Sequence, residues 1–355
     1  MAITSPVACT RESVKRALDS KQTARNDEEV DRAIEAGYQA IKGLTHRDFH
    51  PWTGTRYMDW PNYQYARSYR LWLEANEVAS VATLTSGGTT ISASDYFLRR
   101  SDNIDEAPYT HIEIDLDSSA AFSAGDTHQR SVAITGVFCG CPVNEGPAGT
   151  ITEALADTTG PTVVISNSSL VGVGTIIKVD SERMLVTERA MRDTGVNTAG
   201  ALTASNADVA VTMSTTTDAP TVGDVILIDS ERMLVVDVAS TTLTVKRAWD
   251  GTVLATHANP SDIYALRTLT VTRGFLGTTA ATHLDNATVV KFLPPPGVRE
   301  LNIAEAMNIL QQEGSGYGRE SGKGEGTQEF FGRGLDALRE QVRTAFGRKA
   351  RTRAI

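Results

Sequence analysis

The side chains of this chain that could carry out chemistry occur in patterns that fall short of a known active site. A Gly-rich stretch, 314–326, contains Ser321-Gly322-Lys323, which is similar to the end of a phosphate-binding P-loop. A P-loop needs glycine five residues before its Gly-Lys pair and a hydroxyl residue after it. Here Tyr317 and Gly324 occupy those two positions. The stretch is therefore interpreted as a flexible linker, and no nucleotide cofactor is predicted.

Two groups of potential metal ligands are also incomplete. His46 and His50 are four residues apart and could share one helix face, but Pro51 follows at once and no third ligand is near in the sequence. Cys139 and Cys141 lack Cys-x-x-Cys spacing and a second pair. We predict no metal site, and we expect the thiols to be structural and the chain to be made in a reducing cytoplasm.

Carboxylate pairs occur twice, in the segments Asp180-Ser181-Glu182 and Asp229-Ser230-Glu231. Such pairs could serve acid–base catalysis or calcium binding. Their place at the tip of a predicted hairpin favours turn chemistry and a solvated strand end instead. His257 and His283 also recur at matching positions, which indicates a shared place in a fold. With no nucleophile motif in context, the chain is predicted not to be an enzyme.

Two internal repeats are the strongest signal in the sequence. Residues 174–186 recur as 223–235, with seven consecutive identities and an offset of 49, and residues 244–257 recur as 270–283, with an offset of 26. The first pair predicts two superimposable hairpins that turn at Asp-Ser. The second pair should share one backbone path, with a glycine at positive φ in each copy. Together they predict small β-barrels or sandwiches.

Helical periodicity flanks this β region on both sides. Thr10 can cap a short helix that ends near Asp19, and Asn26 can cap a second helix with an apolar stripe through Leu44. Strands are predicted around a Gly87-Gly88 turn, at 109–116 and at 131–138. After the prolines at 294–296, helical spacing returns. The predicted domains are 1–150 and 293–355, which form one core, and 151–292, an inserted β-repeat domain.

Charge is distributed unevenly along the chain. The net charge is −9, yet residues 333–355 carry seven basic and two acidic side chains. An acidic body is a poor platform for gripping DNA, because phosphate neutralisation supplies most non-specific affinity. No secretory signal and no apolar run long enough for a membrane span occurs in the sequence. The chain is expected to work without contacting a membrane.

Aromatic residues gather between positions 52 and 72 and alternate with arginines. This mixture could bind single-stranded nucleic acid, but it is equally typical of a protein interface. Subunit contact or packing is the favoured interpretation. The subunit-interface candidates are Trp52, Trp60, Tyr65, Tyr69 and Trp72.

The order of the segments resembles a known family. A Thr10-Arg-Glu-Ser-Val-Lys15 helix start precedes a helix that ends in Leu44-Thr-His-Arg-Asp-Phe49, and then come Asp95-Tyr-Phe-Leu98, Ile112-Glu-Ile-Asp-Leu116 and Val132-Ala-Ile-Thr-Gly-Val-Phe138. This order resembles the head-to-tail adaptor (connector) family of long-tailed phages, in the larger version of actinobacterial phages. The likeness covers about 1–145 and 293–355. The repeats, which lie outside it, resemble those of other phage virion proteins.

The resemblance implies an α+β fold: a helical connector core, made of N- and C-terminal helices plus a small antiparallel β element, with an inserted all-β repeat domain. It also implies a structural protein of the virion neck. Such proteins form a ring, usually of twelve copies, between the portal protein and a downstream stopper or tail protein. Genomic DNA would pass through the channel without sequence-specific binding. The alternative is a phage tail or fibre component whose β modules bind carbohydrate or another virion protein.

The family's C-terminal helix typically grips the portal, which makes the end of this chain the candidate docking segment. We expect it to be disordered in the free monomer and ordered in the neck. The residues expected to face the portal or DNA are Leu335, Leu338, Val342, Arg343, Phe346, Arg348, Lys349, Arg351 and Arg353.

Overall fold

A computed structural model describes residues 3–18, 26–60, 67–100, 106–314, 320–321, 328–329 and 333–348. The chain is mostly β, with 37% of residues in strands and 20% in helices. The expected helical core with a small β element is therefore wrong. The reason lies in the segment 52–138, where alternating apolar and polar residues build two sheets around a core of their own.

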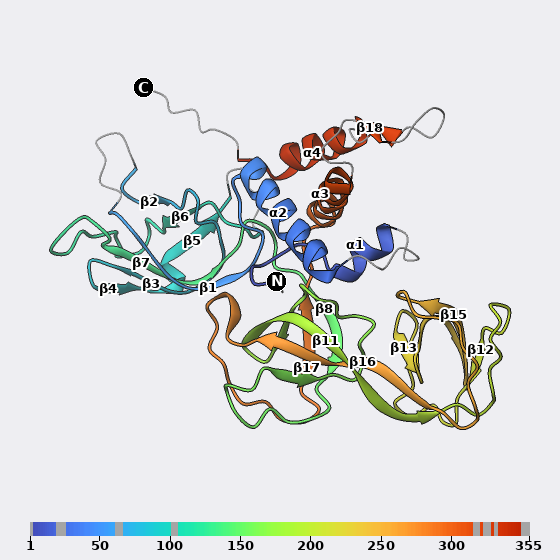
Figure 1. The fold of residues 1–355 in the computed structure, drawn as a ribbon. Helices are drawn as coiled ribbons and strands as arrows, with labels where there is room; N and C mark the ends of the chain where they lie inside the picture. Colours follow the sequence, from blue (N-terminus) through green and yellow to red (C-terminus); the bar gives the residue numbers. More distant parts are fainter. Residues whose placement is uncertain are drawn as a thin grey trace.

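Four helices form one layer, at the top of Figure 1. They are α1 (Arg11–Ala17), α2 (Asp27–Thr45), α3 (Pro296–Gly314) and α4 (Arg333–Phe346). Thr10 caps α1 in a reciprocal pair with Ser13, and Asn26 caps α2 by accepting a hydrogen bond from the Glu28 N–H. Both predicted caps are confirmed. Pro296 is the first residue of α3, where its missing N–H leaves no hydrogen bond unmade.

A β unit beside the helices contains two sheets, and its aromatic and aliphatic side chains share one core. The four-stranded sheet has the order β1-β7-β3-β4, and the three-stranded sheet has the order β2-β6-β5. Gly87 and Gly88, both at positive φ, form the predicted two-residue turn between β3 and β4. The strands are β1 (Trp52–Met58), β2 (Arg70–Trp72), β3 (Val78–Ser86), β4 (Thr89–Ile91), β5 (Tyr96–Arg99, after the 3-10 turn η2, Ala93–Asp95), β6 (His111–Ile114) and β7 (Val132–Phe138).

The ten-stranded sheet contains both sequence repeats. Its first strand, β8 (Glu145–Thr150), begins before the expected domain boundary at residue 151. The other strands are β9 (Thr162–Val164), β10 (Ile176–Val179), β11 (Glu182–Asn197), β12 (Ala210–Thr212), β13 (Val225–Ile228), β14 (Glu231–Ala239), β15 (Thr242–Trp249), β16 (Asp262–Thr272) and β17 (Thr288–Phe292). A 3-10 turn, η3 (Phe275–Gly277), follows β16, and β18 (Glu320–Ser321) pairs with β19 (Gln328–Glu329).

Two modules divide this sheet, and one is inserted into the other. Module 1 consists of β8, β9, β10, β17 and the adjoining ends of β11 and β16, and module 2 consists of β12 to β15 with the far ends of the same two long strands. Each module has its own apolar core. Strands β11 and β16 pair from Leu185–Thr272 to Asn197–Asp262 and therefore run continuously through both modules.

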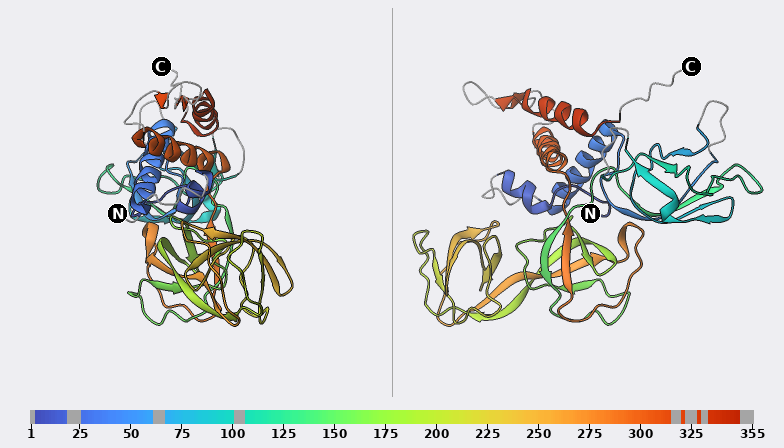
Figure 2. Two further views of the ribbon diagram at one scale, coloured as in Figure 1. Left: turned by 45° about the vertical axis from the view of Figure 1, so that its right-hand side comes forward. Right: turned by 180° about the vertical axis from the view of Figure 1, so that it is seen from behind.

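The parts are arranged in space with module 1 at the centre. In Figures 1 and 2 the helical layer lies above module 1, and the β unit and module 2 extend from opposite ends of the molecule. Val173, Ile176 and Leu185 of module 1 belong to the apolar core of the helical layer, so the two share one interior. Among the described helices, none is long and apolar enough to cross a membrane.

Candidate functional site

The repeated residues meet in space as two equivalent clusters. In the first hairpin Ile176 pairs with Leu185, and in the second Val225 pairs with Leu234, so the two registers match at an offset of 49. Asp180 and Asp229 both have φ of 51° at the turn. The predicted equivalence of the two hairpins is confirmed.

The second repeat also adopts one backbone path in both copies. Positive φ angles recur at Ala248 and Gly274 (51° and 59°), at Asp250 and Leu276 (54° and 53°), and at Gly251 and Gly277 (74° and 78°). In each copy the following threonine closes the loop. The Thr252 hydroxyl accepts from the Arg232 N–H at 3.0 Å, and the Thr278 hydroxyl accepts from the Arg183 N–H at 2.9 Å.

A buried glutamate is the centre of each cluster. Glu182 accepts two hydrogen bonds from the Arg273 guanidinium, at 2.7 and 2.8 Å, and one from the His283 ring at 2.9 Å. Backbone N–H groups of Gly274 and Ala281 donate two more, at 2.9 and 3.0 Å. One carboxylate thus closes the loop between β16 and β17 onto the hairpin.

Module 2 reproduces this arrangement contact by contact. Glu231 accepts two hydrogen bonds from Arg247 at 2.8 Å each, one from His257 at 3.0 Å, and two from the N–H groups of Ala248 and Ala255. In both modules the outer carboxylate contacts the other ring nitrogen: Asp229 lies 2.7 Å from His257 Nδ1, and Asp180 lies 2.8 Å from His283 Nδ1.

The electrostatics of the clusters explain how a buried carboxylate is tolerated. Burial by itself would raise the pKa of Glu182, but the hydrogen bonds from Arg273, the Ala281 N–H, His283 and the Gly274 N–H lower that pKa from 4.5 to about 2. The pKa of Glu231 is lowered to about 2 by the equivalent donors. Both side chains are fully buried, so the expected solvated strand end is wrong for the glutamates, whereas Asp180 and Asp229 are exposed.

Such a cluster is suited to holding a loop and not to proton transfer. Each glutamate already accepts five hydrogen bonds, which leaves it no lone pair for a substrate proton. The expectation that His257 and His283 mark a shared fold position is confirmed. Within the described ranges no three His, Cys, Asp or Glu side chains are grouped so as to hold a metal ion.

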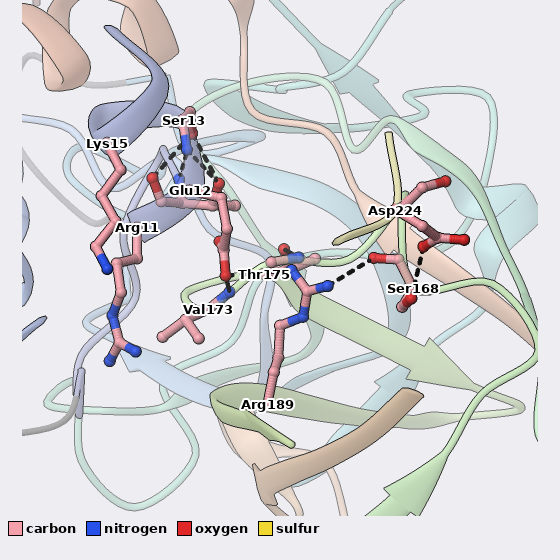
Figure 3. A network of polar contacts seen from close by, with 12 residues as sticks. Arg11, Glu12, Ser13, Lys15, Ser168, Val173, Thr175, Arg189 and Asp224 are labelled. Atoms are coloured by element: carbon pink, nitrogen blue, oxygen red, sulfur yellow. Dashed lines mark hydrogen bonds and ion pairs between the residues drawn. The ribbon is translucent and has the colours of Figure 1, made fainter. Parts of the chain in front are cut away.

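A second polar network joins the helical layer to both modules, and Figure 3 shows its members. The Glu12 carboxylate of α1 accepts from the Val173 N–H at 3.0 Å and from Arg189 of β11 at 3.2 Å. Arg189 also donates to the Ser168 carbonyl at 3.2 Å, and the Ser168 hydroxyl donates to Asp224 of module 2 at 2.6 Å. These contacts form a continuous series of hydrogen bonds that joins α1, module 1 and module 2.

Module 1 has two points where a neighbouring part of the molecule comes too close for a side chain, one facing the helical layer and one facing the β unit. A Cβ at Gly172 would overlap the Glu12 carboxylate, and a Cβ at Gly277 would overlap the Thr53 carbonyl oxygen of β1. Arg183 donates to the Thr53 hydroxyl at 2.7 Å beside the second point. Module 1 is therefore fixed to the α1 helix on one side and to the β unit on the other. Glu12, Thr53 and Gly172 lie outside the repeated segments, so the sequence offered no signal for these three residues.

The C-terminal candidates lie mostly inside the chain's own packing. Val342 is 1% exposed, and the Phe346 ring packs edge-on against Phe49 with centroids 5.5 Å apart. Leu335 and Leu338 are half-buried against the same core. Arg343 forms an ion pair with Glu340, and Arg348 lies 3.6 Å from the buried Glu77. Lys349, Arg351 and Arg353 are outside the described residues.

The aromatic candidates are half-buried within the β unit. Trp52 packs on Phe138 with Arg56 stacked over both rings. The Trp60 indole donates to the Phe122 carbonyl at 3.0 Å. Trp72 stacks on His111, while Tyr69 packs on the core of the unit and accepts from Arg67. Tyr65 is outside the described residues.

The candidate ligands set aside in the sequence have structural partners. The His50 ring contacts the Tyr38 hydroxyl at 2.8 Å and the Val7 carbonyl at 3.1 Å, and His46 ends α2 in the left-handed region. Cys139 and Cys141 are buried free thiols, with sulfur atoms 3.5 Å apart. The Gly-rich stretch is almost wholly outside the described residues.

Comparison of this chain with family models, curated proteins and solved structures gives no match.

Proposed function

We propose that this chain is a structural protein of the phage neck, a subunit of a ring that joins the portal to the next neck or tail protein. The observation that carries the proposal is the use made of the repeated charged residues. The carboxylates of Glu182 and Glu231 accept all their hydrogen bonds from groups of this chain and hold its loops in place. This is a structural role, as expected in a structural protein.

The arrangement of the parts supports this proposal. The helical layer, the β unit and the two modules are joined by short polar links and close backbone approaches, so they form one stiff subunit with separate faces for separate neighbours. The helices and strands at the residues that resemble the adaptor family lie at α1, α2, β5, β6 and β7. An acidic body suits a channel that DNA must pass without being held.

In this proposal the portal and the stopper or tail protein are the partners, and twelve copies form the ring. Because α4 packs its apolar side on the helical core, the portal would contact its outer side and the basic end of the chain. The inserted modules would lie on the outer face of the ring, away from DNA.

The proposal is tested by locating the chain in virions that carry it. Gold-labelled antibodies against the two β modules should mark the head–tail junction. Mass measurement of portal-bearing heads mixed with the purified protein should show an increase equal to the mass of a ring, and heads without portal should show no increase. Labelling along the tail shaft or at its tip would overturn the neck assignment and favour the tail or fibre alternative.

A further inference from the structure

A face that module 1 buries is left open in module 2. In module 1 this face consists of Val173, the cross-strand pair Ile176 and Leu185, and the η3 loop. Val173, Ile176 and Leu185 are 1%, 4% and 0% exposed, because they pack into the core of the helical layer.

The N-terminal segment covers this face of module 1 directly. A Cβ at Gly174 would lie 2.9 Å from Val7, 3.1 Å from the Cys9 carbonyl oxygen and 3.3 Å from Ile3. The Arg11 N–H donates to the Val173 carbonyl at 3.1 Å. Module 1 therefore buries this face against apolar side chains of the N-terminal segment.

Module 2 presents the equivalent residues without that cover. Val222 corresponds to Val173 at the offset of 49, and it is 54% exposed. Val225 and Leu234, the equivalents of Ile176 and Leu185, are half-buried. Trp249 corresponds to Phe275 of module 1 at the offset of 26 between the copies of the second repeat. We call Val222, Val225, Leu234 and Trp249 the open face.

A cleft of about 410 Å³ lies between α1 and three residues of the open face, and Val222 is not part of its lining. Its lining includes Val225, Leu234 and Trp249, and among the described residues seven basic and three acidic side chains surround it. Lys15 of α1 and Asp250 of module 2 approach to 3.8 Å across it. Four of the basic side chains already pair with the three acids: Arg11 and Lys15 with Asp27, Arg189 with Glu12, and Arg232 with Asp250. The cleft thus has apolar side chains on the module 2 side and a net positive charge around them, and it fits an apolar group flanked by carboxylates.

The β unit, at the opposite end of the molecule from module 2, carries a group of that kind. Leu116 is 71% exposed at the turn after β6, between Asp115 and Asp117. The Asp117 N–H donates to the Asp115 carboxylate at 3.0 Å, which holds the turn in shape. Figures 1 and 2 show β6 and module 2 at opposite ends of the molecule. One copy cannot bring its own turn to its own open face.

We propose that the open face of module 2 binds the 115–117 turn of a second copy of this chain. The contact is heterologous, since two different surfaces meet, and repeated contacts of that kind close into a ring or extend as a filament. Apolar contact at Leu116 supplies attraction, and the two aspartates meet the net positive charge around the cleft. This inference rests on the proposed homo-oligomer and names the surfaces that build it.

Chemical cross-linking of the full chain tests the pairing. A short bismaleimide should convert the V222C/L116C double variant into a ladder of covalent dimers, trimers and larger species. An equimolar mixture of the V222C and L116C single variants should stop at dimers, because each copy then has one reactive surface. Cys9, Cys139 and Cys141 are buried and should not react. The matched control is L284C/L116C, since Leu284 is 82% exposed on module 1, and it should give no ladder.

A second measurement needs no cross-linker. V222D should weaken self-association measured by analytical ultracentrifugation about tenfold, as expected when an exposed apolar side chain beside the cleft is replaced by a charge that repels the two aspartates of the turn. L284D should leave association unchanged. Circular dichroism melting of each variant checks that the fold is intact.

The outcomes separate this inference from the proposed neck function. If the wild type associates while V222D has no effect and the double variant forms no ladder, the open face is not the contact, and the neck function stands. If the wild type stays monomeric at every soluble concentration, the pairing is overturned. The gold labelling of virions then decides the neck function on its own.

Discussion

Glu182 and Arg273 are 91 residues apart in the chain and form a buried two-bond ion pair at 2.7 and 2.8 Å. Their counterparts in module 2, Glu231 and Arg247, are only 16 residues apart. The difference arises because module 2 is inserted between the strands that carry the first pair. The Glu182–Arg273 pair thus joins two ends of module 1 that module 2 separates in the sequence, together with the contact of His283 with Asp180.

Breaking this pair should destabilise module 1. Replacement E182Q leaves Arg273 buried without a countercharge, which costs about 3–5 kcal/mol of unfolding free energy. Urea unfolding followed by circular dichroism measures the loss. E188Q, at an exposed position of the same strand, should change stability by less than about 0.5 kcal/mol. Equal stability of E182Q and E188Q would show that the cluster is not a structural clamp.

The lowered pKa values of Glu182 and Glu231 predict loss of stability in acid. A carboxyl group whose folded pKa is below its unfolded value stabilises the fold fully above the unfolded value of 4.5, and this contribution disappears as the pH falls towards about 2. Each glutamate contributes about 3 kcal/mol by this linkage. Unfolding free energy measured between pH 6 and pH 2 should therefore fall more steeply in the wild type than in the E182Q/E231Q variant. Parallel curves would contradict the assignment.

Gly277 should be far less replaceable than Gly195. Both have positive φ, at 78° and 71°, so alanine strains the backbone by about 1–2 kcal/mol at either position. Gly195 has open space around it, whereas a Cβ at Gly277 would overlap the Thr53 carbonyl oxygen. G277A should therefore lose clearly more stability than G195A in thermal melts. It should also speed hydrogen exchange in β1, and unchanged exchange there would contradict the docking of η3 on β1.

Glu12 should hold α1 to the modules. In E12Q the side chain loses its charge, so the contacts with the Val173 N–H and Arg189 weaken, and hydrogen exchange at residues 172–175 should rise about tenfold. R16A, at an exposed position of the same helix, is the control and should leave exchange unchanged. Similar protection in both variants would mean that α1 is held by its apolar contacts alone.

The apolar side of α4 should matter for folding of the free chain. F346A removes the ring that packs on Phe49 and should cost about 2–3 kcal/mol, while removal of residues 349–355 should leave stability unchanged. Chemical denaturation of both variants measures this difference. A wild-type-like midpoint for F346A would support the earlier expectation that this helix orders only in the assembled neck.

Several elements were predictable from local patterns. The caps of α1 and α2, the Gly87-Gly88 turn and the repeated hairpins all follow from interactions within a few residues. The number of strands outside the insertion was underestimated. The short strands between residues 52 and 138 are stabilised by sheet partners far away in the sequence, which local patterns do not reveal.

The order of the repeats indicates that one module is inserted into the other, although the sequence analysis did not predict this insertion. Copies of the first segment begin at 174 and 223, and copies of the second begin at 244 and 270. Pairing the inner two and the outer two gives one module inside another. Charged residues that recur in both copies were the signal for the clusters, but which acid meets which base depended on the pairing of β11 with β16.

The sequence by itself determined the repeats, the helix caps, the tight turns and the uneven charge, because these depend on residue type and on neighbours close in the chain. Only the tertiary structure decided that Glu182 is buried, that Val173 is covered while Val222 is open, and that α4 packs on the chain's own core. Burial depends on which surfaces meet, and repeated segments of similar sequence acquire different surroundings when only one of them lies against the helical layer.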